Sequence, residues 1–88
     1  MNAFVYILKD ENGKFYIGST NDLQRRMKQH HSGHTQTTDR MKNFVLVLSQ
    51  KYNSLNEARR IELKIKKLKR KDYIKKMVAE GCIKIKPS

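Results

Sequence analysis

The sequence predicts an α+β domain in which a three-stranded antiparallel sheet is flanked by about three helices. Two observations support this fold class. Three short segments are rich in β-branched and aromatic residues, and three longer ones carry apolar residues at helical spacing. With 88 residues, 38% of them hydrophobic, the chain can form one small core. We expect a single domain at residues 1–80, followed by a tail at 81–88.

The three strands are predicted at residues 4–8, 15–18 and 44–48. The last of these is a continuous apolar run, which is typical of a strand buried on both faces. We therefore expect it to be the most buried strand, in the centre of the sheet. Between the first two strands, Asn12 and Gly13 tolerate a positive φ, which predicts a hairpin turn.

The length of this hairpin loop decides which side chains share a face of the sheet. In a two-residue loop, Tyr6 and Tyr16 would point to opposite faces. In a three-residue loop, residues 11–13 with Gly13 left-handed, Tyr6 pairs with Gly18 and both tyrosines lie on one face. We expect the three-residue loop, because it alone lets the two hydroxyl groups act together.

Helices are predicted at residues 23–31, 55–68 and about 71–79. Asp22 is placed to cap the first, and the S-x-x-E pattern that starts at Ser54 is a capping box for the second. Gly81 is expected to end the third. The apolar positions at helical spacing, which we expect in the core, are Leu23, Met27, Leu55, Ala58, Ile61, Ile65, Leu68, Tyr73, Ile74, Met77 and Val78.

The chain carries a formal net charge of +12, from 20 basic and 8 acidic residues. Thirteen basic and four acidic residues lie in 45–88, against seven and four in 1–44. Such a field attracts a polyanion, most commonly nucleic acid, although an anionic membrane surface or ribosomal RNA would satisfy the same charge.

The remaining composition limits the compartment in which the protein works. A single cysteine, Cys82, excludes an internal disulfide framework and suits a reducing compartment. The longest apolar run, residues 3–8, is too short to span a membrane or to serve as a signal peptide. We therefore expect a cytoplasmic protein with no membrane partner.

One acidic residue stands apart from the other seven, which have turn, cap or surface explanations. Helical spacing places Glu62 at the margin of the buried stripe, beside Ala58. An acidic group in such a place needs a partner. A salt bridge to Arg26 or to a neighbouring lysine is one explanation, and a bound metal ion is the other.

An ordered set of residues carries a resemblance to a known family. Val5-Tyr6-Ile7 is followed by Tyr16-Ile17-Gly18, and then by Arg26, His30 and Glu62. Over about residues 3–78 this set resembles the GIY-YIG nuclease domain, and in particular the small stand-alone members of that superfamily. The first motif lacks its glycine, and no asparagine follows residue 56, where many nucleases of the family carry one near the site.

The resemblance implies a divalent-metal-dependent endonuclease that hydrolyses phosphodiester bonds of nucleic acid, DNA in preference to RNA. Tyr6 and Tyr16 would line the site and position or deprotonate the attacking water. Arg26 would contact the scissile phosphate, and His30, rather than His31, would assist proton transfer. Glu62 would hold one Mg²⁺ or Mn²⁺ ion. This chemistry is consistent with the reaction, which needs an activated water and positive charge beside the phosphate oxygens.

Further basic residues are candidates for nucleic-acid contacts away from the cut, although a solvated charged face is an alternative explanation for each. They are Arg25, Lys28, Arg40, Arg59 and Lys66. Contacts to phosphate position a protein without reading sequence, so we expect low sequence specificity, which leaves targeting open to a protein partner. Two other functions stay open: a non-catalytic nucleic-acid-binding module with the same fold, and an RNA- or ribosome-associated protein.

Overall fold

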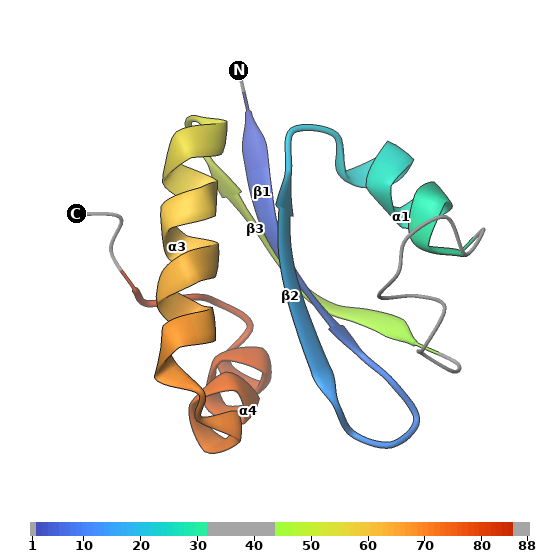
Figure 1. Cartoon of the computed structure of the whole chain (residues 1–88), viewed down its shortest axis with the longest axis vertical. Coiled ribbons are helices and arrows are strands. Elements are labelled where there is room, and N and C mark those ends of the chain that lie inside the picture. The colour runs from blue at the N-terminus through green and yellow to red at the C-terminus, as the bar shows by residue number, and fades with distance from the viewer. Residues whose placement is uncertain (1, 32–43, 86–88) are drawn as a thin grey trace.

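The computed structural model of the chain describes residues 2–31 and 44–85. Their elements, in chain order, are β1 (Ala3–Lys9), β2 (Phe15–Thr20), α1 (Leu23–His31), β3 (Val45–Tyr52), α3 (Leu55–Leu68) and α4 (Lys71–Glu80). The strands form one antiparallel sheet in the order β2-β1-β3. In Figure 1, α3 and α4 lie on one side of the sheet and α1 on the other. The predicted α+β fold class is confirmed.

The central strand is β1, so the prediction that residues 44–48 occupy the centre was wrong. In β1 the side chains of Val5, Ile7 and Leu8 are fully buried. The edge strand β3 leaves Val45 and Leu46 56% and 42% exposed. A continuous apolar run shows that a strand is hydrophobic, but it does not show which strands pair on either side of it.

The hairpin between β1 and β2 has the predicted three-residue loop. The backbone N–H of Asp10 donates to the Lys14 carbonyl at 3.0 Å, and the Gly13 N–H donates to the Asp10 carbonyl at 3.1 Å. Gly13 has a φ of 82°, in the left-handed region that favours glycine. The buried Asp10 carboxylate accepts the backbone N–H groups of Asn12 and Lys14, both at 2.9 Å, which holds the loop in this shape.

This loop sets the register that the tyrosine hypothesis requires. Tyr6 pairs with Gly18, and Leu8 pairs with Tyr16. Because side chains alternate between the faces of a strand, Tyr6 and Tyr16 lie on the same face of the sheet, as predicted.

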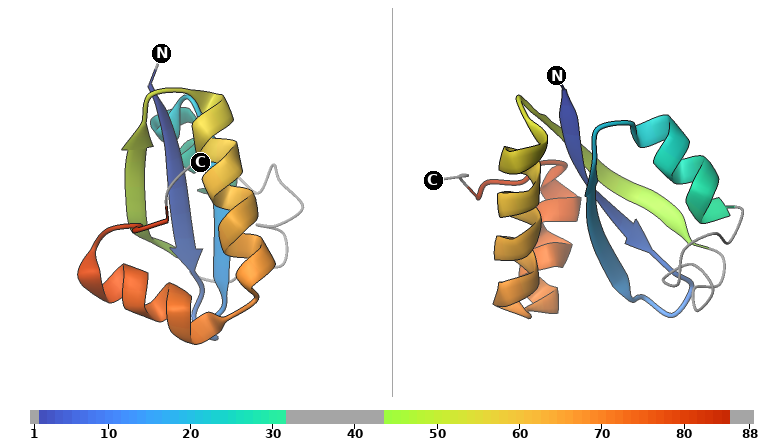
Figure 2. Two further views of the ribbon diagram at one scale, coloured as in Figure 1. Left: turned by 90° about the vertical axis from the view of Figure 1, so that its left-hand side faces the viewer. Right: turned by 45° about the horizontal axis from the view of Figure 1, so that its top comes forward.

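The two faces of the sheet carry separate apolar clusters. The larger cluster lies under α3 and α4, and its buried members include Val5, Ile7, Leu48, Ala58, Ile61, Ile65, Ile74 and Met77. The smaller one lies under α1, where buried Tyr6 and Leu8 contact Tyr16, Leu23, Met27 and Phe44. Figure 2 shows this arrangement of helices on both sides of the sheet. Tyr6 is therefore a core residue of the smaller cluster as well as a site candidate.

The predicted caps at the starts of α1 and α3 and at the end of α4 are confirmed. The Asp22 carboxylate accepts the Arg25 N–H at 3.1 Å, and the Ser54 hydroxyl accepts the Glu57 N–H at 3.2 Å. Gly81 ends α4 with a φ of 76°. These contacts satisfy backbone groups that a helix end leaves without partners.

Two residues expected in the core are partly exposed. Leu68 and Tyr73 are 38% and 40% exposed. Leu68 is the last residue of α3, directly before the left-handed C-cap Lys69 (φ 49°).

The segment after α4 is attached to the sheet through Ile83, which is buried. The side-chain amide of Gln50 in β3 accepts the Ile83 N–H at 2.7 Å and donates to the Ile83 carbonyl at 3.0 Å. At least the first residues of the expected tail therefore pack on the core, while the domain boundary at residue 80 stays a prediction. In the described part of the chain, no helix has the length and apolar character needed to cross a membrane.

Candidate active site

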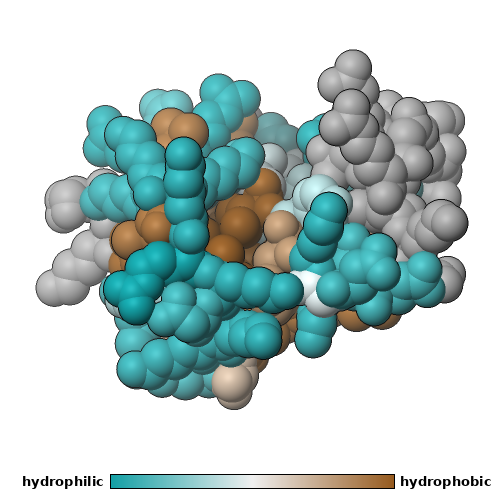
Figure 3. Space-filling view, turned by 60° about the horizontal axis from the view of Figure 1, so that its bottom comes forward, coloured by the Kyte–Doolittle hydropathy of each residue, from teal (hydrophilic) through white to brown (hydrophobic). Residues whose placement is uncertain are grey.

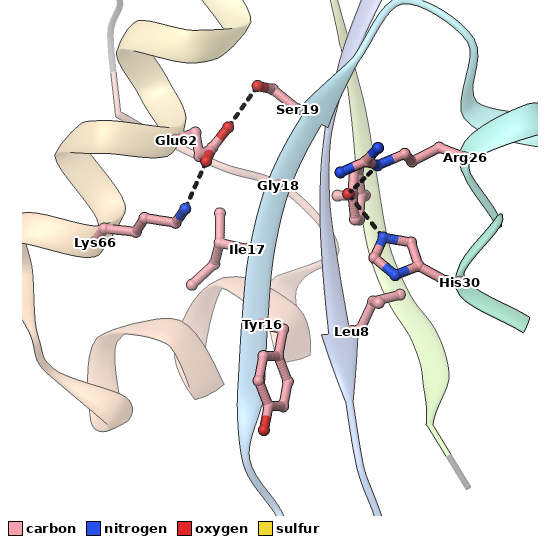
Figure 4. A pocket seen from close by; sticks show the side chains of 10 residues that line it. Leu8, Tyr16, Ile17, Gly18, Ser19, Arg26, His30, Glu62 and Lys66 are labelled. Carbon is pink, nitrogen blue, oxygen red and sulfur yellow. Dashed lines mark hydrogen bonds and ion pairs between the residues drawn. The ribbon is translucent and has the colours of Figure 1, made fainter. Parts of the chain in front are cut away.

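A pocket of about 160 Å³ lies at the β2 edge of the sheet, with α1 and α3 on its two sides (Figure 4). All five residues predicted to be catalytic line it: Tyr6, Tyr16, Arg26, His30 and Glu62. Gly18, Ser19 and Lys66 complete its polar part. Residues from β1, β2, α1 and α3, far apart in the chain, thus surround one small space.

On the α1 side of the pocket, two side chains contact the hydroxyl group of Tyr6. Arg26 Nε donates a hydrogen bond to Tyr6 Oη at 3.2 Å, and His30 Nε2 lies 3.0 Å from the same oxygen. Because Arg26 already donates to this oxygen, the hydroxyl group can donate its own hydrogen to a neutral His30. A proton can therefore pass from Tyr6 to His30, while the Arg26 guanidinium group stays protonated and donates to the tyrosine oxygen.

Two features of the sequence bring Arg26 and His30 to Tyr6. Their i, i+4 spacing places both on one face of α1, and the Leu23 and Met27 side chains pack the helix against the sheet on that side. His30 is only 4% exposed, and its ring meets the rings of Tyr6 and Phe44 edge-on, with centroids 5.6 and 6.1 Å away. The imidazole is therefore held in place by packing as well as by its hydrogen bond.

Gly18 makes room for the Tyr6 side chain. A Cβ atom built at Gly18 would lie within 3.0 Å of three Tyr6 atoms: the hydroxyl oxygen, Cζ and Cε1. Since the two residues pair directly across the strands, the tyrosine side chain crosses β2 at the one position where no side chain blocks it. The structure thus gives a steric reason for a glycine at the third position of the Tyr16-Ile17-Gly18 triplet.

Glu62 lies on the other side of β2 from Arg26 and His30 (Figure 4). The Ser19 hydroxyl donates to Glu62 Oε1, and Lys66 Nζ forms an ion pair with Glu62 Oε2 at 2.6 Å. The Glu62 side chain is 17% exposed. A salt bridge to a neighbouring lysine was one of the two explanations for Glu62, and the structure contains it, with Lys66 rather than Arg26 as the partner.

Tyr16 lines the same pocket, but its hydroxyl group points along β2, away from Arg26 and Glu62 (Figure 4). The structure therefore brings Tyr6, Arg26 and His30 into direct contact and leaves Tyr16 at the margin. The roles of all five residues stay predictions.

The basic residues proposed for nucleic-acid contacts are distributed around the pocket. Lys66 lines the pocket itself, whereas Arg25 lies beside an adjoining hollow of about 190 Å³ that it shares with Arg26. Lys28 borders an apolar groove beside α1. Arg59 is exposed on α3, three residues before Glu62. Arg40 and the His31 side chain lie outside the described residues.

Exposed lysines continue the basic surface beyond the pocket. They lie on α3, on α4 and at the turn between them, and include Lys67, Lys69, Lys71, Lys75 and Lys76. On the face shown in Figure 3, hydrophilic side chains cover most of the described surface and border an apolar strip.

The donor atoms at Glu62 suit a hard divalent cation only if other ligands complete its coordination. Within residues 2–31 and 44–85, no group of three or more His, Cys, Asp or Glu side chains could enclose a metal ion. Mg²⁺ is commonly held by one or two carboxylates together with water and substrate phosphates. The Glu62 carboxylate, with the Ser19 hydroxyl beside it, fits that mode of binding.

Three site residues were missed or misplaced by the sequence prediction. Gly18 could have been found from the register, because it pairs with Tyr6. Lys66 was expected away from the cut, although its i+4 spacing from Glu62 predicts an ion pair. Ser19 was not among the predicted site residues, and no local signal indicates its contact with a helix 43 positions later.

Comparisons with known proteins agree with this geometry. The GIY-YIG catalytic domain family matches residues 2–77. The UPF0213 protein BH0048 of Halalkalibacterium halodurans is 40% identical over 72 residues, which are 81% of this chain and 77% of that protein. The UPF0213 protein YhbQ of Escherichia coli K12 is 34% identical over 90% of this chain and 79% of its own length.

A solved structure supports the same assignment. The solution NMR structure of the UPF0213 protein BH0048 from Bacillus halodurans is similar, with a TM-score of 0.59 and 36% identity. The alignment covers 92% of this chain and 87% of that one. Together with the residues gathered in the pocket, these matches show that the chain belongs to the GIY-YIG family.

Proposed function

We propose that this protein is a divalent-cation-dependent endonuclease that hydrolyses phosphodiester bonds of nucleic acid, DNA in preference to RNA. The observation that carries the proposal is the hydrogen-bonded set of Tyr6, Arg26 and His30 in the same pocket as Glu62. Membership of the GIY-YIG family supports it at the level of a nuclease domain.

The hydrogen bonds suggest how the attacking water loses its proton. Tyr6 Oη accepts the proton of a water molecule while it passes its own hydrogen to Nε2 of His30. The water becomes a hydroxide-like nucleophile, the tyrosine is again neutral, and the histidine becomes an imidazolium. Arg26 donates to Tyr6 Oη and stabilises negative charge on this oxygen during the transfer.

Arg26 also provides positive charge for the phosphate. Its Nε donates to Tyr6, and its Nη1 donates to Gln29 Oε1 at 3.3 Å. Arg26 is partly buried and borders both the pocket and the adjoining hollow. The planar guanidinium group matches two phosphate oxygens, which an ammonium group cannot do as well. We propose that Arg26 binds the non-bridging oxygens of the scissile phosphate and stabilises the charge that develops on them.

Glu62 is the residue that would hold a divalent cation, Mg²⁺ or Mn²⁺, and Ser19 would keep its carboxylate oriented. Such a cation, when bound, supplies charge neutralisation at the phosphate and at the leaving oxygen.

The lining of the pocket supports low sequence specificity. Its polar residues, including Ser19, Arg26, His30, Glu62 and Lys66, suit a phosphate group. Recognition would then rest on the backbone of the nucleic acid, and backbone contacts carry no sequence information. Targeting would come from the structure of the nucleic acid or from a protein partner.

Cleavage assays on single-stranded, nicked and branched DNA, with RNA in parallel, test this proposal in the presence of Mg²⁺ or Mn²⁺. We expect Arg26→Ala to lower the single-turnover rate about 10²- to 10³-fold, as removal of a transition-state donor does. We expect Glu62→Gln to lose the part of the cleavage rate that Mg²⁺ or Mn²⁺ stimulates. The matched control is Arg25→Ala, which changes an exposed neighbour on the same helix. We expect this variant to bind nucleic acid more weakly but to cleave the bound substrate at nearly the wild-type single-turnover rate. A wild type that cuts no substrate, or equal rates for the two arginine variants, would refute the proposal.

A second function is favoured by one specific contact. Both Glu62 oxygens have protein partners, Ser19 and Lys66, so the site is neutralised without a cation. A non-catalytic binding module with the +12 charge of this chain would bind nucleic acid without cutting it, and its affinity would fall steeply with salt. The same assays separate the two functions.

A further inference from the structure

Lys66 is part of the site rather than of the surrounding basic surface. Its ammonium group lies 2.6 Å from Glu62 Oε2, and both residues line the pocket that contains Tyr6 and Arg26. The two residues are one turn apart on α3, so no rearrangement of the backbone is needed to form or break their contact. The other oxygen, Oε1, accepts the Ser19 hydroxyl.

The two partners of Glu62 differ in how they affect a cation. Ser19 is neutral, and a carboxylate has about four lone-pair directions, so the Ser19 hydrogen bond leaves room for a cation ligand. Lys66 places a full positive charge beside Glu62 Oε2, the carboxylate oxygen that does not contact Ser19. A divalent cation cannot approach that oxygen without either displacing the ammonium group or accepting strong repulsion from it.

The Lys66 side chain is able to leave. It is 50% exposed, and it has a flexible four-carbon stem that lets the ammonium group move into solvent. An ion pair between residues at i and i+4 on a partly exposed helix surface contributes little to stability, so breaking it costs little.

We propose that Lys66 controls cation binding at Glu62. In the free protein Lys66 neutralises the carboxylate, and it releases the carboxylate when a divalent cation binds. This inference rests on the proposed function, because it concerns the cation that the endonuclease would use. It follows that Lys66 lowers the affinity of the free protein for the cation.

Nucleic acid should reverse this effect. A phosphate group in the pocket offers the Lys66 ammonium group a new anionic partner, and Glu62 is then free for the cation. Cation and nucleic acid would therefore bind cooperatively, each raising the affinity for the other by the same factor.

The test is Mn²⁺ binding to the protein without nucleic acid, measured from the electron paramagnetic resonance signal of the free ion. A unit charge about 4 Å from a divalent cation weakens binding roughly thirtyfold in water, and salt reduces this effect. We therefore expect Lys66→Met to bind Mn²⁺ about five to thirty times more tightly than the wild type. The matched control is Lys67→Met, which removes the same charge from the next residue of α3, outside the pocket. Its effect should stay within about twofold.

A second background shows whether the gained affinity belongs to Glu62. In Glu62→Gln protein, adding Lys66→Met should leave Mn²⁺ binding unchanged. The inference is overturned if Lys66→Met binds no more tightly than Lys67→Met, including the case in which neither binds, or if the gain persists without Glu62. If binding responds to Lys66 as expected but no variant cuts nucleic acid, the inference stands and the endonuclease proposal fails.

Discussion

Replacing Gly18 by alanine should break the Tyr6 hydrogen bonds and destabilise the sheet. The added Cβ would lie within 3.0 Å of three Tyr6 atoms, closer than real Cβ contacts. The paired backbones of β1 and β2 cannot easily separate, because β1 also pairs with β3 on its other side. The Tyr6 side chain must therefore move, and it leaves its contacts with Arg26 and His30.

The magnitude follows from three terms. Overpacking of a well-packed core costs about 1–3 kcal/mol. The two lost hydrogen bonds of buried Tyr6 cost about 1 kcal/mol each. The lower backbone entropy of alanine in the unfolded chain offsets about 0.5–1 kcal/mol. The expected net loss is about 2–4 kcal/mol, which for a domain of this size lowers the Tm by roughly 10–20 °C.

A double-mutant cycle with Tyr6→Ala isolates the cause. We would measure the free energy of unfolding by chemical denaturation for the wild type, both single variants and the double variant. In the Tyr6→Ala background no ring crosses position 18, so Gly18→Ala should be neutral or slightly stabilising. The entropy gain is the same in both backgrounds and cancels, so the expected interaction energy is about 3–5 kcal/mol. Equal costs of Gly18→Ala in both backgrounds, or a cost below about 0.5 kcal/mol in the wild type, would refute the steric explanation.

Two further predictions concern β3 and its contacts. Gln50→Leu removes both hydrogen bonds to Ile83. We therefore expect the free energy of unfolding to fall by about 1–3 kcal/mol and the C-terminal residues to be proteolysed faster. Unchanged stability together with a protected C-terminus would contradict this. Burial raises the pKa of Tyr52 above its ordinary value, although the hydrogen bond from Gln50 acts in the opposite direction. The pKa of Tyr52 is higher in the folded state than in the unfolded chain. Its contribution to the free energy of unfolding is therefore fully present below about pH 10 and is lost as pH rises through the raised pKa. Tyr52→Phe should therefore lose less stability than the wild type between pH 9 and pH 11 in urea denaturation, and equal losses would show that Tyr52 does not contribute.

Predictions that rest on neighbouring residues were confirmed. The hairpin turn follows from Asn12 and Gly13, and Gly13 has the expected positive φ. The three-residue loop was preferred to a two-residue one because it lets Tyr6 and Tyr16 act together, and the structure contains it. That turn fixes the register, and the register puts Tyr6 and Tyr16 on one face. The caps at Asp22 and Ser54 are equally local, since each side chain meets a backbone N–H three residues later.

Predictions that depend on distant contacts were incomplete. The apolar run at 44–48 did not show that β1 would lie between β2 and β3. The marginal position of Glu62 on its helix and its ion pair with a neighbouring lysine were correctly inferred. Its contact with Ser19 was not, because a helical wheel does not show which strand the helix covers.

By itself, the sequence determined the class of fold, the position of the hairpin turn, the caps at Asp22, Ser54 and Gly81, and the set of residues that resembles a nuclease site. The physical reason is that turn geometry, capping and helical spacing depend on side chains only a few positions apart. The tertiary structure alone decided that β1 is central, that the Tyr6 side chain crosses β2 over Gly18, and that Ser19 contacts Glu62 across β2 from Arg26. These features arise when α1 and α3 pack on opposite faces of the sheet. The physical reason is that the contacts and burial of these side chains depend on elements that are far apart in the chain.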